Sequence, residues 1–417
     1  MGTTTKLNIA ILGGCGHVGL PLGITFASRG YDVTLIDIND KAVHTVNRGA
    51  MPFLEKGGEE ALKKVIGKSL RAVTQGQAVS DCGVVIAVTG TPVDAHLNPR
   101  VNDVIQVIDA YTPYMNPNQI LILRSTLAPG VTELIYKHLK RTLPGLQLAF
   151  CPERVAQGYA IEEIYNFPQI VSAFELDAEN RAAELFSAIA PEIIRLTPRE
   201  AELAKLFSNT WRYIHFAIAN QHYMIAESCG ANFNRIYHAL THNYPRLKNL
   251  ARPGLTAGPC LFKDTMQLSS AYHNNYFLGH AAMLVNEGLP TFLVEQLETK
   301  MGTLENKNIG LFGMAFKPDH DDTRESLSYK VKKILHAKMA NVWDTDVYQP
   351  THAKLPEILQ KADGFILGVP HTEYRNLNLL NRPFVDCWGV WGPKPNLAES
   401  AIRKNDSKAF HSEQITF

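Results

Sequence analysis

Cysteine and metal-binding patterns are sparse in this chain of 417 residues. The six cysteines, at positions 15, 82, 151, 229, 260 and 387, include no C-x-x-C pair, so neither a zinc site nor a disulfide framework is expected. His238 and His242 stand four residues apart, but no glutamate lies between them as in H-E-x-x-H, and no third ligand is evident. We therefore expect reduced thiols and no metal.

The chain also lacks an excess of positive or negative charge, and it lacks long apolar runs. A formal net charge of +1 gives no electrostatic reason to expect nucleic acid or an anionic membrane as a partner. No run approaches the roughly 18 apolar residues of a membrane span. A strand-like run begins almost at the N-terminus and leaves no room for a signal peptide. These absences favour a cytoplasmic protein.

What the sequence does contain begins with a glycine-rich turn. The apolar run 6–12 is followed by a G-x-G-x-x-G pattern and then by the apolar start of a helix. In such a unit the first glycine allows the tight turn, the second lets a pyrophosphate approach the backbone, and the third permits close helix packing. The residues expected to line a dinucleotide here are Gly14, Gly16, His17, Val18 and Gly19.

Asp37 ends the strand predicted over residues 32–36. A carboxylate at this place accepts hydrogen bonds from both hydroxyls of a ribose and repels a 2′-phosphate. The combination of strand, glycines, helix, second strand and terminal acid therefore predicts NAD rather than NADP.

Three further apolar runs, 84–88, 120–123 and 146–150, are typical of strands buried on both faces. The polar residues that follow them include Thr91, Thr126, Glu153 and Arg154. Because ligands of a doubly wound sheet lie outside the carboxyl ends of its strands, we expect Thr91, Thr126 and Glu153 to border one crevice with the nicotinamide. Each of the three also fits a turn or helix cap, and for Thr91 that interpretation is equally good.

Residues 199–229 read as one long helix that stops at Gly230. At 1.5 Å per residue such a helix is about 46 Å long, more than one small domain needs. We expect it to join two lobes and to contribute to a homodimer interface. Lys205 and Asn209 lie one turn apart and project from the same face, where Lys205 is either directed into a site or solvated.

The stretch 258–264 contains the strongest candidate for a nucleophile. If Cys260 starts a helix, the helix N-terminus and nearby Lys263 favour its thiolate. Asp264, four residues on, then shares the same face and places a base beside the nucleophile. An ordinary buried cysteine at a helix start is the alternative interpretation.

A second α/β unit begins with a strand at 308–312, and the run 321–326 has the composition of a helix cap. Further strands are expected near 341–343, 364–368 and 384–385. The prediction is an α/β protein with two Rossmann-like doubly wound domains joined by a helical domain with a long central helix. The expected boundaries are 1–197 for the NAD-binding domain, 198–303 for the helical dimerisation domain with the cysteine, and 304–417 for the C-terminal domain, with a loose tail at 404–417.

Taken in order, these motifs resemble the nucleotide-sugar 6-dehydrogenases, which include UDP-glucose and UDP-N-acetylmannosamine dehydrogenases. The resemblance covers essentially the whole chain. It rests on the glycine loop, Ser125–Gly130, Pro152–Arg154, Glu202–Lys205 with Asn209, Gly258–Asp264, Gly313–Lys317 and Asp322–Ser326.

The resemblance implies a four-electron oxidation of the sugar C6 alcohol to a carboxylate in two NAD-dependent steps. Cys260 would form a thiohemiacetal and then a thioester, Lys205 and Asn209 would stabilise the oxyanion, and the C-terminal domain would hold the uridine diphosphate. Water and proton handling would fall to Asp264, Thr126 and Glu153. The other residues implied at the cofactor are Thr91 and Arg324. Those implied at the sugar or its phosphates are Glu153, Arg154, Lys205, Asn209, Arg246, Gly258, Phe316 and Lys317, with the arginine near position 246 able to come from a partner subunit.

The substrate sugar stays open between two branches of the resemblance. The run 152–155 and the spacing of Arg246 favour UDP-N-acetylmannosamine, whereas Lys263 and Asp264 favour UDP-glucose. Two departures are His17, where tyrosine is common, and a 257–259 run with one glycine in place of the usual pair. Two functions of a different kind also fit parts of the pattern: a two-electron hydroxy-acid dehydrogenase and a non-catalytic nucleotide-sugar sensor.

Overall fold

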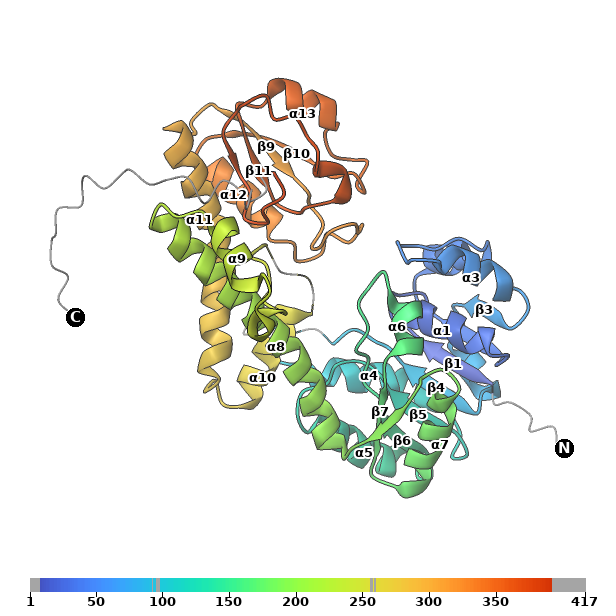
Figure 1. The fold of residues 1–417 in the computed structure, drawn as a ribbon. Coiled ribbons are helices and arrows are strands. Elements are labelled where there is room, and N and C mark those ends of the chain that lie inside the picture. The colour runs from blue at the N-terminus through green and yellow to red at the C-terminus, as the bar shows by residue number, and fades with distance from the viewer. Residues whose placement is uncertain (1–7, 92, 95–97, 256–257, 259, 392–417) are drawn as a thin grey trace.

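The computed structural model describes residues 8–91, 93–94, 98–255, 258 and 260–391. Three parts follow one another along the chain: a large sheet with its helices, a set of long helices, and a smaller sheet (Figure 1). The predicted tail at 404–417 and the departures at 257 and 259 lie outside the described residues.

The first part is an eight-stranded sheet in the order β3-β2-β1-β4-β5-β6-β7-β8. Only the β6–β7 pair is antiparallel. Strands β2 and β3 are added on one side of β1, and β4 and the strands after it are added on the other side. This switch point between the parallel strands β1 and β4 places the ligand crevice outside their carboxyl ends. The strands are β1 (Ile9–Leu12), β2 (Val33–Ile36), β3 (Leu70–Val73), β4 (Val84–Ala87), β5 (Ile120–Leu123), β6 (Gln147–Phe150), β7 (Gln169–Ala173) and β8 (Ile193–Arg195).

Both faces of this sheet are covered, which explains the continuous apolar runs. Ile9 and Ile11 belong to the core on one face, and Ala10 and Leu12 belong to the core on the other. Alternate residues of a strand point to opposite faces, so a strand buried on both sides is apolar at most consecutive positions. The helices of this part are α1 (Gly19–Ser28), α2 (Asp40–Asn47), α3 (Gly58–Val65), α4 (Val101–Tyr111), α5 (Val131–Thr142), α6 (Ala160–Asn166) and α7 (Leu176–Ser187), with short 3-10 turns at Gly76–Asp81 and Thr112–Tyr114.

The long helix predicted over 199–229 is confirmed as α8 (Pro198–Ser228). It starts at a capping box in which Thr197 accepts from the Glu200 amide and the Glu200 carboxylate accepts from the Thr197 amide. Gly230 follows with φ +71°, as a helix stop requires. Figure 1 shows α8 leading from the large sheet toward the small one. It packs against α10 (Leu261–Ala271) and α11 (Phe277–Met301), and α9 (Phe233–Thr241) follows it.

The last part is a four-stranded parallel sheet in the order β10-β9-β11-β12. Its elements are β9 (Asn308–Phe312), α12 (Ser328–Ala337), β10 (Asn341–Thr345), α13 (Leu355–Lys361), β11 (Gly364–Leu367) and β12 (Phe384–Val385). Together with the mostly parallel first sheet this confirms the predicted α/β class. No helix among the described residues is both long and apolar enough to cross a membrane.

The expected helix cap at 321–326 is wrong in its detail. Helix α12 begins only at Ser328, and its first flanking residue, Leu327, makes no side-chain cap. Of the predicted run, Ser326 alone serves the helix, since its hydroxyl accepts from the Ser328 amide at 3.3 Å. The acidic residues Asp321 and Asp322, which precede Ser326, instead contact residues of the first domain.

Candidate active site

The glycine loop lies at the carboxyl end of β1. The left-handed residue of the turn is Gly13 (φ +72°), which immediately precedes the G-x-G-x-x-G pattern. A Cβ on Gly14 would lie 2.7 Å from the Cβ of Leu35, and a Cβ on Gly19 would lie 2.6 Å from the Gly13 oxygen. Gly14 and Gly19 are therefore needed for close packing against β2 and within the loop.

Gly16 differs because a Cβ there would meet nothing closer than 3.5 Å. The loop thus leaves open space at the glycine where a pyrophosphate would approach, with His17 and Val18 leading into α1. Asp37 lies beside the same loop: one carboxylate oxygen accepts from the Cys15 amide and the other from the Asn39 amide, each at 3.0 Å. These residues fit a dinucleotide with free ribose hydroxyls.

The loop after β4 contacts the helix that carries the cysteine. Lys263 of α10 donates to the Thr91 carbonyl at 3.2 Å and to the Thr91 hydroxyl at 3.0 Å. Thr91 and Thr126 line one hollow, and Gln267 of α10 lines it with them. The structure therefore brings both threonines, which lie beyond the ends of β4 and β5, against α10.

Cys260 immediately precedes α10, as predicted, and it is exposed. Asp264 is completely buried one turn further on. Its carboxylate accepts from the Asn209 amide group of α8 at 2.5 Å, and its other oxygen lies 3.3 Å from the Lys263 ammonium. Lys205 lies close enough to Cys260 for its positive charge to act to lower the pKa of the thiol. Helices α8 and α10 thus bring Cys260, Lys205, Asn209 and Asp264 together.

The electrostatics of Cys260 correct the expected thiolate. Although the residue as a whole is exposed, the protein packed around its thiol partly desolvates it and so raises the pKa of Cys260, and the Asp264 carboxylate raises it further. Lys263, Lys205 and Arg324 act in the opposite direction but do not reverse the shift. Desolvation of the thiol and repulsion between a thiolate and the neighbouring carboxylate therefore outweigh the nearby cations.

Glu153 lies apart from the hollow lined by Thr91 and Thr126. Its carboxylate pairs with Arg124, which is 1% exposed, and also accepts from the amides of Arg154 and Val155. The Arg154 side chain donates to the Pro168 carbonyl. The role of Arg124 was not predicted from the sequence. The signal was present, because a charged residue directly after a buried strand needs a partner of opposite charge.

Residues of the C-terminal part approach Cys260 from the other side. Gly258 has φ +97°, and a Cβ there would lie 2.6 Å from the Phe316 ring, so only glycine fits. The positive charge of Arg324 acts to lower the pKa of Cys260. The same guanidinium donates to both carboxylate oxygens of Asp322, from Nε at 2.9 Å and from Nη2 at 2.6 Å. Of the predicted residues, Phe316 and Arg324 are therefore close to the cysteine loop.

Lys317 and Arg246 occupy different settings. The Lys317 ammonium donates to the Gln157 carbonyl of the first domain, and burial lowers its pKa. Arg246 is exposed on the short turn Pro245–Leu247. Within the described chain, no contact joins Arg246 to the other predicted site residues.

A loop of the C-terminal part reaches the glycine loop of the first part through a polar contact that was not predicted. His17 lies 3.8 Å from Asp322, and the amide of Leu54 donates to Asp321 at 3.2 Å. His320 approaches His17, with 6.1 Å between the ring centroids. Both histidines are largely withdrawn from water, and this burial lowers the pKa of each to about 4.

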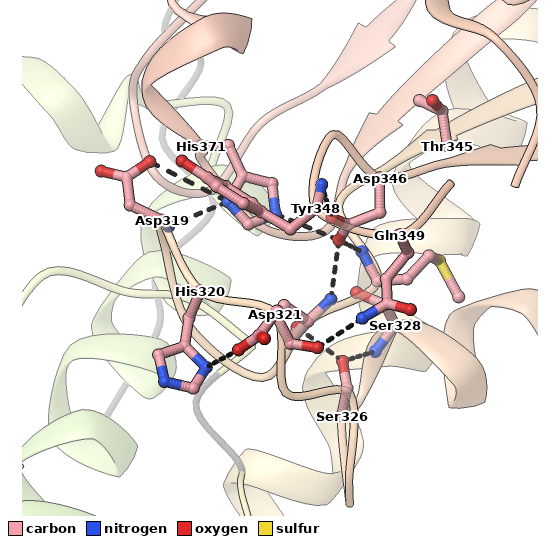
Figure 2. Close-up of polar contacts among 12 residues, drawn as sticks. Asp319, His320, Asp321, Ser326, Ser328, Thr345, Asp346, Tyr348, Gln349 and His371 are labelled. Atoms are coloured by element: carbon pink, nitrogen blue, oxygen red, sulfur yellow. Dashed lines mark hydrogen bonds and ion pairs between the residues drawn. The ribbon is translucent and has the colours of Figure 1, made fainter. Parts of the chain in front are cut away.

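Figure 2 shows how the segment that carries His320 is held. Asp346, at the end of β10, accepts from the amides of Met314 and Ala315 at 2.6 and 2.9 Å and from His371 at 3.1 Å. His371 in turn accepts from the Asp319 amide at 2.9 Å. The loop 313–322 is therefore fastened to its own sheet while it contacts the glycine loop.

These two histidines predict a stability that falls in acid. Between pH 6.5 and pH 4 a histidine in the unfolded chain binds a proton, whereas buried His17 and His320 stay neutral. As the pH falls through this window, each of the two histidines therefore lowers the free energy of unfolding by up to about 1 kcal/mol per pH unit. We expect the melting temperature of His320→Gln to fall less steeply over this window than that of the wild type. The exposed His44→Gln control should follow the wild type. Equal slopes for all three proteins would contradict the assignment.

Comparison with known proteins gives matches along most of the chain. Models of the UDP-glucose/GDP-mannose dehydrogenase family match residues 7–190 as the NAD-binding domain, 199–287 as the central domain and 310–393 as the UDP-binding domain. The UDP-N-acetyl-D-mannosamine dehydrogenase of Pyrococcus horikoshii is 31% identical, with 89% of this chain and 91% of that protein covered. The protein of the same name from Yersinia pestis is 29% identical, with 91% and 98% covered.

Solved structures share the fold. A UDP-glucose dehydrogenase from Pyrobaculum islandicum superimposes with a TM-score of 0.86 at 25% identity, with 93% of this chain and 96% of that chain covered. The UDP-N-acetylmannosamine dehydrogenase structure from Pyrococcus horikoshii gives a TM-score of 0.83 at 28% identity, with 89% and 91% covered.

Proposed function

The chain belongs to the UDP-glucose/GDP-mannose dehydrogenase family, and we propose that its substrate is UDP-N-acetyl-D-mannosamine, oxidised at C6 to the carboxylate. The enzyme is an NAD-dependent UDP-sugar 6-dehydrogenase. The observation that carries the reaction is the pairing of Asn209 with Asp264 beside Cys260. The choice of sugar is supported by the names of the two relatives that match over about nine-tenths of the chain. UDP-glucose is the second candidate, since the Pyrobaculum islandicum protein has this fold.

The cofactor contacts follow from the crevice at the β1–β4 switch point. We assign the pyrophosphate to the loop at Gly14, Gly16 and Gly19, the adenosine ribose to Asp37, and the nicotinamide end to Thr91 and Thr126. His17 and Val18 continue the loop, and Arg324 reaches the same region from the C-terminal part. When bound, NAD accepts a hydride from C6 in each of the two oxidations.

The protein's own residues supply the covalent chemistry. Cys260 adds to the C6 aldehyde as its proton passes to Asp264, which gives a thiohemiacetal. Lys205 and the second amide proton of Asn209 stabilise the oxyanion, a contribution of about 10²–10³ in rate for a single donor. The oxyanion form of the thiohemiacetal loses its hydride in the second oxidation and becomes the thioester. Once Asp264 has released the thiol proton to solvent, it deprotonates a water that attacks the thioester carbonyl. The C–S bond then breaks, Cys260 leaves as a thiolate and takes that proton from Asp264, and the carboxylic acid product loses its own proton to solvent. Asp264 thus has two roles because it lies between the nucleophile and Asn209.

Glu153 and Thr126 complete the proposed proton and water handling. The Glu153 carboxylate pairs with Arg124, and we assign it the role of accepting protons and orienting water. The sugar and its phosphates would lie among Arg154, Gly258, Phe316 and Lys317, with the uridine against the C-terminal sheet. Lys317 would exchange its present contact with the Gln157 carbonyl for a phosphate.

We also propose a homodimer that forms along α8. Phe207, Trp211, Ile218 and Ile225 are exposed large apolar side chains of this helix. Their spacings of four and seven residues place them on one face. A second copy would cover this stripe, and its Arg246 would then be available to the site. Light scattering should show a dimer for the wild type and a monomer for Trp211→Glu, whereas a wild-type monomer would contradict the proposal.

The choice of sugar is tested by initial rates of NADH formation with UDP-N-acetylmannosamine, UDP-N-acetylglucosamine and UDP-glucose at equal concentrations. We expect the highest kcat/KM with UDP-N-acetylmannosamine. A higher value with UDP-glucose would replace the substrate proposal without changing the chemistry. We place the reaction in the cytoplasm, because a catalytic thiol needs a reducing compartment.

A further inference from the structure

The turn 313–317, which follows β9, carries two side chains that contact other parts of the chain. A Cβ on Gly258 of the cysteine loop would lie 2.6 Å from the Phe316 ring. The Lys317 ammonium donates to the Gln157 carbonyl of the first domain. Neither Phe316 nor Lys317 is fully buried. The place of these two side chains therefore depends on what holds the backbone of the turn.

Asp346 holds the inner end of this turn. Its Oδ2 accepts from the amides of Met314 and Ala315 at 2.6 and 2.9 Å, and its Oδ1 accepts from the Tyr348 amide at 2.9 Å. Burial acts to raise the pKa of Asp346, but the hydrogen bonds that the carboxylate accepts outweigh this effect and lower the pKa. A charged acceptor binds an amide about twice as strongly as a neutral one, so the inner end is firmly fixed.

His371 joins Asp346 to the outer end of the turn (Figure 2). Its Nδ1 accepts from the Asp319 amide at 2.9 Å, so this nitrogen carries no proton, and its Nε2–H donates to Asp346 at 3.1 Å. The ring is completely buried. Asp319 is held a second time, because its carboxylate accepts from the amide and the hydroxyl of Thr372 at 2.7 and 2.8 Å. The backbone is thus fixed on both sides of residues 316–317.

A second aspartate–histidine pair of the C-terminal part lies close by and holds something else. Asp344 stands two residues before Asp346, and its carboxylate contacts His352 at 2.6 Å and Lys332 at 2.8 Å. Within the described chain, no hydrogen bond or ion pair joins this second pair to residues 313–319. The two pairs therefore share their chemistry and their domain, and they differ in whether they hold the turn.

We propose that Asp346 and His371 are positioning residues for the substrate. They hold the turn 313–317 so that Phe316 and Lys317 meet the sugar and its phosphates beside the cysteine loop. Their role rests on the proposed function, which places the sugar and its phosphates at these two side chains. Both residues are buried, so they act through the backbone of the turn and make no contact with the substrate themselves.

The test measures KM and kcat of the full chain for its UDP-sugar in Asp346→Asn and His371→Leu. We expect each variant to raise KM about tenfold and to change kcat by less than about threefold, because a loosened turn weakens substrate binding without removing a reacting group. NAD affinity, measured by calorimetry, should stay at the wild-type value. The matched controls Asp344→Asn and His352→Leu break the second pair and should keep the wild-type KM.

Poor folding of a variant gives a different result, because it reduces the number of active molecules and lowers the apparent kcat at unchanged KM. Asp319 offers a further test at an exposed position. Its φ is +52°, so Asp319→Gly removes the carboxylate without straining the backbone, and we expect KM to rise about threefold. Asp319→Asn can still bond to Thr372 and should keep the wild-type KM.

Three results would overturn the proposal: a lower kcat at unchanged KM in the Asp346 and His371 variants, an equal rise of KM in the two controls, or a wild-type KM throughout. The proposed substrate is judged separately. If no UDP-sugar is oxidised, calorimetric titration with UDP supplies the same comparison through its phosphates. Weaker binding of UDP in the Asp346 and His371 variants alone would then support their role and contradict the proposed substrate, and equal binding in all variants would overturn their role.

Discussion

Cys260→Ser is expected to lose overall turnover by on the order of 10³-fold or more while it still binds NAD. A serine hydroxyl is a far weaker nucleophile than a thiol and cannot form the thioester that the second oxidation produces. The substitution removes no group assigned to the dinucleotide, so affinity for NAD should change little. Turnover is measured by NADH formation with UDP-N-acetylmannosamine, and NAD affinity by calorimetry.

Cys229→Ser is the matched control for this experiment. Cys229 is the other exposed cysteine among the six, and it lies at the end of α8, outside the candidate site. Its replacement should leave turnover unchanged. A Cys260→Ser protein that still completes the oxidation would contradict the covalent mechanism and favour a two-electron hydroxy-acid dehydrogenase.

The second large effect is expected from Asp264→Asn. Loss of the carboxylate removes the base for the thiol and for the hydrolytic water, so turnover should fall by about 10²-fold or more. The same change should make Cys260 more reactive, because the charge of Asp264 raises the pKa of this thiol and Lys263 and Lys205 remain. We therefore expect slower catalysis together with faster alkylation by iodoacetamide at pH 7.

For Asp264→Asn, peptide mass spectrometry measures the alkylation of Cys260 independently of turnover. Exposed Cys229 is an internal reference, since its environment does not include Asp264 and its alkylation rate should not change. The electrostatic account is wrong if alkylation of Cys260 slows while that of Cys229 stays constant. Unchanged turnover would remove Asp264 from the proton transfers.

Much of the fold could be predicted because local patterns determine it. The apolar runs at 84–88 and 120–123 correspond to β4 and β5, and the 199–229 pattern to α8. The Cys260–Asp264 spacing also places both residues on one helix face, which the structure shows. In each case the controlling interaction lies within a few residues along the chain.

The parts that could not be predicted depend on approaches between distant segments. Glu153 pairs with Arg124, and His17 of the glycine loop lies 3.8 Å from Asp322 in a loop of the C-terminal part. The direction of the Cys260 pKa shift depends on burial by neighbouring elements, which no local pattern reports. The bonds that hold the turn 313–317 become visible only when the segments after β10 and β11 are placed beside it.

The most direct test of the central claim is the amount of NADH produced per sugar consumed. Limiting UDP-N-acetylmannosamine would be incubated to completion with excess NAD, with UDP-glucose run in parallel. Two NADH for each sugar is the predicted result, because Cys260 holds the intermediate through a second oxidation to the acid. One NADH for each sugar would show that the reaction stops at the aldehyde, and it would contradict the role assigned to Cys260.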